Sequence, residues 1–81
     1  MTQDEAREAM SDANRRLIRA ENERASAWHE LERALGVGDP FDISRADAAM
    51  TRADDEYERS LREQAAAESA YVAIAVTDGE W

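Results

Sequence analysis

Few side chains in this sequence are of the types that perform catalysis or bind metals. There is one histidine, His29, and no cysteine. Zinc sites need several histidine or cysteine ligands, and di-iron helical bundles need paired Glu-x-x-His motifs, which are absent. The sequence also lacks a glycine-rich phosphate loop and any Ser/His/Asp combination with the spacing of a catalytic triad. We therefore expect no enzyme, no cofactor and no metal site.

The densest group of carboxylates, here called the acidic patch, consists of Asp54, Asp55, Glu56 and Glu58. A calcium loop gathers its carboxylates around a turn that contains glycine. A helix instead points neighbouring carboxylates outward in different directions. The acidic patch is therefore expected to be a solvated helix face, with docking of a basic partner surface as the alternative.

Composition limits the classes of function further. The 81 residues carry a net charge of −9, and all ten basic residues are arginine. This charge argues against direct binding to nucleic acid or to anionic lipid. The N-terminus lacks the features of a secretory signal, and the longest apolar run, residues 71–76, is far shorter than the roughly 20 residues of a membrane span. We expect a single cytoplasmic domain that does not enter the membrane.

The positions of glycine and proline divide the chain into two helices. Thr2 and Glu5 have the spacing of a capping box, and no glycine or proline follows until Gly36. Gly36 and Pro40 predict a helix end, and Ser44 resembles a second N-cap. We expect helices over residues 3–35 and 45–76, a loop over 36–44 and a tail over 77–81. This is an all-α, antiparallel two-helix hairpin.

A heptad pattern predicts how the two helices pack. Each helix repeats one small and one larger residue every seven positions, which allows the helix axes to approach closely. This alanine-rich coiled-coil seam has small residues at Ala6, Ala13, Ala20, Ala27, Ala34, Ala46, Ala53, Ser60 and Ala67, with Ile74 ending the series. Its larger residues are Met10, Leu17, Arg24, Leu31, Met50, Tyr57, Gln64 and Tyr71.

Two polar residues interrupt this seam at its middle. We expect Arg24 to lie over Tyr57 and reach Glu56 or solvent, and Gln64 to fix the register of the helices. A buried polar pocket for a ligand is the alternative.

A second set of apolar residues follows one flank of the hairpin, where a two-helix fold cannot bury it. This apolar face consists of Ile18, Trp28, Leu35, Leu61, Ala65 and Val72, joined by Ala25 and Ala75. Exposed apolar patches of this kind mark interaction sites, and tryptophan is enriched among interface hot spots. We expect self-association into a dimeric four-helix bundle. The alternatives are direct binding of another protein, or coverage by Phe41, Ile43 or the tail with Trp81.

These observations predict a non-enzymatic protein–protein interaction module: a small regulator, inhibitor, adaptor or assembly factor. Small phage- or plasmid-borne regulators often have this profile. The alternative is an acidic nucleic-acid mimic that blocks a DNA- or RNA-binding enzyme, as anti-CRISPR and anti-restriction proteins do. The interspersed arginines weaken that alternative, because a mimic needs carboxylates in continuous rows.

Overall fold

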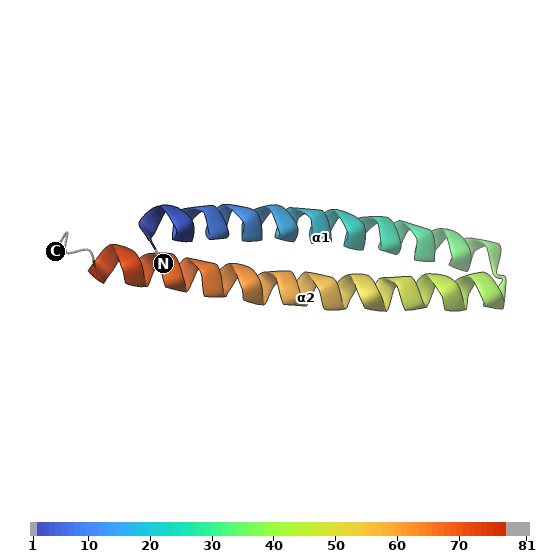
Figure 1. Cartoon of the computed structure of the whole chain (residues 1–81). Helices are drawn as coiled ribbons and strands as arrows, with labels where there is room; N and C mark the ends of the chain where they lie inside the picture. Colours follow the sequence, from blue (N-terminus) through green and yellow to red (C-terminus); the bar gives the residue numbers. More distant parts are fainter. Residues whose placement is uncertain (1, 78–81) are drawn as a thin grey trace.

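The chain forms two long helices that lie side by side and run in opposite directions (Figure 1). The computed structural model describes residues 2–77. Helix α1 spans Gln3–Val37 and helix α2 spans Pro40–Thr77. The molecule is a thin rod with extents of 61 × 17 × 13 Å. The predicted all-α hairpin is therefore confirmed, whereas the tail with Trp81, one alternative cover for the apolar face, lies outside the described residues.

The capping box at the start of α1 is confirmed. The backbone N–H of Glu5 donates to the Thr2 hydroxyl at 3.2 Å, and the Glu5 carboxylate accepts from the Thr2 N–H at 3.3 Å and from its hydroxyl at 3.0 Å. These bonds satisfy donors that the first turn of a helix cannot pair internally. They also favour the ionised carboxylate, so the pKa of Glu5 lies below its ordinary value of 4.5.

The connection between the helices is much shorter than the predicted loop over 36–44. Helix α1 continues through Gly36 to Val37, and Gly38 adopts a left-handed conformation with φ of 82° and donates to Ala34 O at 2.9 Å. Only Gly38 and Asp39 separate the helices. A left-handed glycine is a common way to end a helix. The prediction that a glycine ends the first helix is therefore correct, but the glycine is Gly38 and not Gly36.

Helix α2 begins at Pro40 rather than at Arg45, which corrects the second boundary. The Asp39 carboxylate accepts a hydrogen bond from the Phe41 N–H at 3.0 Å, and the Asp39 carbonyl accepts from the Ile43 N–H at 3.0 Å. Proline suits the first position of a helix because the N–H that it lacks would have no partner there. Asp39 is therefore the N-cap, and Ser44 lies within the helix.

The interface between α1 and α2 is made mainly of small side chains, as the heptad pattern predicts. Leu17 is the one large apolar residue that is buried in the described part of the chain, at 7% exposed. The larger seam residues Met10, Leu31, Met50, Tyr57 and Tyr71 are half-buried. The other buried residues are Ala6, Ala13, Ala20, Ala34, Ala46, Ala53 and Ser60. The core is therefore thin, and much apolar surface stays outside it.

Candidate protein-binding face

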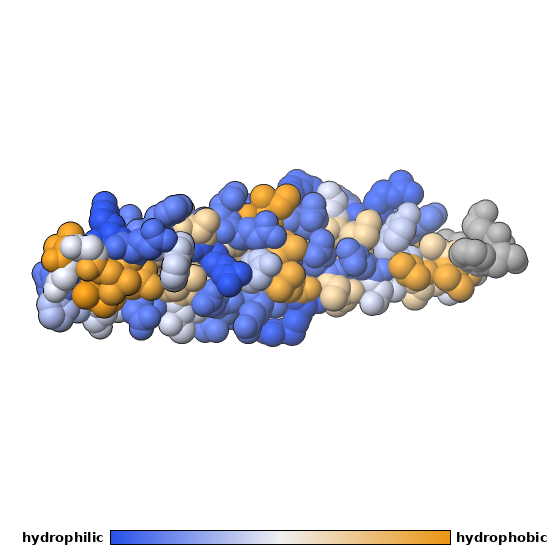
Figure 2. All heavy atoms as spheres, turned by 180° about the vertical axis from the view of Figure 1, so that it is seen from behind, coloured by the Kyte–Doolittle hydropathy of each residue, from blue (hydrophilic) through white to orange (hydrophobic). Residues whose placement is uncertain are grey.

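The apolar face predicted from the sequence is exposed in the structure. The exposed fractions are 48% for Ile18, 49% for Trp28, 57% for Leu35, 40% for Leu61 and 57% for Val72. Ala65 is exposed as well. In Figure 2, the apolar surface on the side shown forms separate islands along the rod, with hydrophilic side chains between them. A partner would therefore meet several apolar contact points rather than one continuous strip.

The turn end of the hairpin carries further exposed apolar residues. Val37 is 70% exposed and Phe41 is 74% exposed. Phe41 does not fold back over the apolar face, because Leu35 remains 57% exposed. The sequence interpretation placed both Val37 and Phe41 in a loop. The signal for Phe41 is the pair Asp39-Pro40, an N-cap followed by proline at the first helical position, and the signal for Val37 is Gly38, which ends α1 directly after it.

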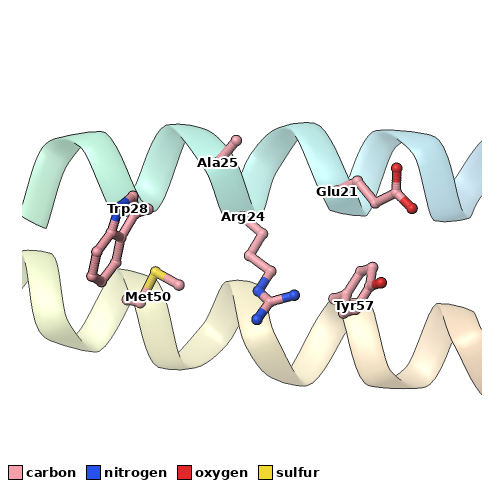
Figure 3. Close-up of a pocket in the computed structure, with 6 residues that line it drawn as sticks. All are labelled: Glu21, Arg24, Ala25, Trp28, Met50 and Tyr57. Atoms are coloured by element: carbon pink, nitrogen blue, oxygen red, sulfur yellow. The ribbon is translucent and has the colours of Figure 1, made fainter.

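A shallow, open hollow lies beside Trp28, where α1 and α2 meet (Figure 3). Its volume is about 430 Å³. Figure 3 shows the Trp28 ring reaching from α1 toward α2 near Met50, and the Arg24 side chain reaching toward α2 beside Tyr57. The lining residues are Glu21, Arg24, Ala25, Trp28, Met50 and Tyr57. The hollow thus offers apolar walls with a carboxylate and a guanidinium among them.

Arg24 forms one wall of this hollow through contacts with two residues of α2. Its guanidinium carbon lies 4.8 Å from the centre of the Tyr57 ring, within the range of a cation–π contact. Its Nε lies 2.8 Å from Asp54 Oδ1. Asp54 Oδ1 is buried and accepts no hydrogen bond of good geometry. The contact between Arg24 and Asp54 is therefore an ion pair without an aligned hydrogen bond. Arg24 lies over Tyr57 as predicted, and its side chain is 47% exposed, in line with the expected reach to solvent; its carboxylate partner is Asp54 and not Glu56.

Two more polar contacts join the helices. Gln64 Nε2 donates to Asn14 Oδ1 at 3.3 Å, and Arg16 Nε donates to Glu63 Oε2 at 3.0 Å. The role of Gln64 in fixing the register stays a prediction. The Arg16 and Glu63 side chains are 52% and 41% exposed, so their pairing adds at most about 1 kcal/mol to stability.

The acidic patch is not a continuous row of free carboxylates. Asp54 is paired with Arg24, and Glu56 is paired with Arg59 at 3.2 Å. Asp55 and Glu58 are exposed. Positive charge therefore lies next to half of the patch.

The heptad positions of the apolar face hold a different balance of charge from the rest of the hairpin. Some of these positions come directly after a small seam residue, as Trp28 follows Ala27, and the others come two residues before one, as Ile18 precedes Ala20. Together they include every member of the apolar face. Arg7 is their one basic residue. Their acidic residues are Asp4, Glu21, Glu32, Asp47, Asp54, Glu58 and Glu68. Apolar side chains on this side of the hairpin are thus surrounded by carboxylates.

No metal-binding cluster occurs within residues 2–77, where no three His, Cys, Asp or Glu side chains gather. His29 is exposed, next to Trp28 in α1. Neither of the two described helices is long and apolar enough to cross a membrane.

Comparisons with other proteins give no relative from which to argue. No protein-family model matches the chain, and no curated protein or solved structure shows significant similarity to it.

Proposed function

We propose that this protein is a non-enzymatic protein–protein interaction module that acts by occupying a partner, as an inhibitor, adaptor or assembly factor does. The observation that carries the proposal is the exposure of Trp28, at 49%, beside an open hollow on a face with four other exposed large apolar residues: Ile18, Leu35, Leu61 and Val72. Apolar surface arranged in this way is typical of protein-binding sites.

Trp28 is the residue expected to contribute most to binding. Trp28 is already 49% exposed, so a partner that covers it buries apolar surface without disturbing the hairpin. Tryptophans in such positions are frequent hot spots, where truncation to alanine costs about 2 kcal/mol or more of binding free energy.

Two kinds of occupant are compatible with this face. A second copy would give the homodimeric four-helix bundle that the exposed apolar face suggests. A different protein, with a basic surface, would instead match the carboxylates around the apolar residues.

Site-specific photo-crosslinking tests the proposal. A photoreactive phenylalanine replaces Trp28 in one variant and the adjacent, exposed His29 in a matched control, and both are irradiated in the cells that make the protein. We expect a discrete protein adduct from position 28 and little or none from position 29. Adducts of equal yield from both positions, or from neither, would contradict a binding role for this face.

The net charge of −9 supports a second candidate, the nucleic-acid mimic. Its weakness is the Arg24–Asp54 and Arg59–Glu56 pairing, which interrupts the acidic patch. A mimic would bind through carboxylates, so it would lose its target at high salt and would tolerate Trp28→Ala. The interaction module would instead lose its partner on Trp28→Ala. Measuring the affinity of wild type and Trp28→Ala for the partner therefore separates the two candidates.

A further inference from the structure

We infer that the occupant of the apolar face is an amphipathic helix of another protein, with basic residues beside its apolar anchors, which completes a three-helix bundle with α1 and α2. This inference rests on the proposed function and adds the chemistry of the partner. The relevant observations are the charges of the face, the location of the arginines, and the hollow beside Trp28.

The first argument is charge complementarity. Seven acidic residues and one arginine occupy the heptad positions of the face: Asp4, Glu21, Glu32, Asp47, Asp54, Glu58 and Glu68, with Arg7. Arg24 lies in the seam and neutralises only Asp54. Interfaces favour partners of opposite potential, and like charges brought together at an interface cost several kcal/mol. A partner with lysine or arginine around its apolar residues satisfies this condition.

The second argument concerns the location of the other arginines. Arg45, Arg52 and Arg59 recur every seven residues along α2, each directly before a small seam residue. This position lies on the opposite side of the helix from the apolar face. A second copy that packed through the same face would therefore bring carboxylates against carboxylates, without these arginines to offset them. The charge distribution thus disfavours self-association through this face.

The third argument is the shape of the site. The hollow lies where α1 and α2 meet, and Trp28 and Tyr57 come to it from different helices (Figure 3). A groove between two helices accepts a third helix, whose anchors then recur at spacings of three, four and seven residues. Trp28 and Leu35 are one heptad apart, which is roughly 10 Å along a helix. A partner helix can place one apolar side chain in the hollow and the next beside Leu35.

The experiment uses designed peptides as probes and the full chain with Trp81→Phe, so that Trp28 is the remaining tryptophan. The first peptide is an amphipathic helix of about 18 residues, roughly 27 Å long, with leucine on one face and lysine on the other. The second has glutamate in place of lysine, and the third has serine in place of leucine. Trp28 fluorescence measures binding, and sedimentation equilibrium measures the mass of the free protein.

We expect the Leu/Lys peptide to bind one-to-one and shift Trp28 emission to shorter wavelength. The Leu/Glu and Ser/Lys peptides should bind at least about 30-fold more weakly, and Trp28→Ala should weaken binding of the Leu/Lys peptide by a similar factor in a label-based assay. The double variant Glu21→Gln/Glu58→Gln should weaken it by roughly tenfold at low salt. The matched control, Glu8→Gln/Asp55→Asn, makes the same change in net charge at positions outside the face and should change the affinity less than about twofold.

Equal effects of the two double variants, or equal binding of the Ser/Lys peptide, would show that net charge alone drives binding and would overturn the inference. A dimer of the free protein that Trp28→Ala dissociates, with no peptide binding, would assign the face to a second copy. That outcome overturns this inference but leaves the proposed function intact. The comparison of crosslinking from positions 28 and 29 tests the proposed function separately.

Discussion

The guanidinium of Arg24 stacks on the Tyr57 ring, 4.8 Å from its centre, and joins α1 to α2 at the middle of the alanine-rich seam. The same side chain pairs with Asp54 at 2.8 Å. An arginine at a seam position can therefore contribute to packing through its stem and its planar head, because both lie against α2 while the charge remains near solvent.

Replacing Arg24 by alanine should lower the free energy of unfolding by about 1 kcal/mol. The change removes a cation–π contact and an ion pair, each of which contributes less than about 1 kcal/mol when half-exposed. Urea unfolding followed by circular dichroism measures the effect. Arg19→Ala, an exposed arginine on the same helix, is the control and should stay within about 0.5 kcal/mol of wild type. Equal losses from the two variants would mean that the contact with Tyr57 adds nothing.

The two glycines at the end of α1 should respond to alanine in opposite ways. Gly38 has a φ of 82°, which alanine adopts only with strain, so Gly38→Ala should destabilise the hairpin by about 1 kcal/mol. Gly36 is helical, and a Cβ there would meet no atom within 4 Å, so Gly36→Ala should stabilise by about 0.5–1 kcal/mol. Thermal unfolding of the two variants and the wild type compares them directly. A loss of stability at Gly36 would contradict the position of the turn.

The capping box should make the stability of α1 depend on pH. The pKa of Glu5 is lowered by its hydrogen bonds with Thr2, so the ionised form stabilises the folded state above the unfolded pKa near 4.5. This contribution should fade as pH falls from about 4.5 through the lower folded-state pKa. Urea midpoints of wild type and Glu5→Gln, measured at pH 7 and pH 3, should differ at the higher pH and converge at the lower one. A constant difference across this range would show that the Glu5 carboxylate plays no ionic role.

The small size of the buried seam residues should make the seam intolerant of larger ones. Ala20 is 2% exposed, so Ala20→Leu should push the helices apart and cost about 1–3 kcal/mol. Ala66 is exposed on α2, and Ala66→Leu is the matched control, expected within about 0.5 kcal/mol of wild type. Chemical unfolding gives both values. A neutral Ala20→Leu would indicate that the seam can open without cost.

Much of the fold could be read from the sequence because its signals are local and periodic. The capping box at Thr2 and the recurrence of alanine every seven residues depend on spacing alone, and the buried residues follow that spacing. The exposed apolar face followed by elimination, since those residues had no place in the seam.

The turn and the partner of Arg24 were misjudged for physical reasons. Proline both ends and begins helices, and only the hydrogen bond from the Phe41 N–H to Asp39 decides that Pro40 begins one. Asp54 and Glu56 lie on opposite flanks of the seam, so either could meet Arg24, and its side-chain conformation selected Asp54. Sequence spacing does not determine such a choice.

The two-residue turn also sets the order in which the hairpin can form. Near the turn, pairing α1 with α2 closes a short loop, whereas Arg24 and Asp54 lie 30 positions apart and Asn14 and Gln64 lie 50 apart. The entropic cost of closing a loop rises with this separation, so contacts next to Gly38 form most readily. The contacts of Ala6, at the far end, form readily only after those nearer the turn are in place. The hairpin is therefore expected to close from its turn outward, with the end opposite the turn, near Ala6, closing last and opening first.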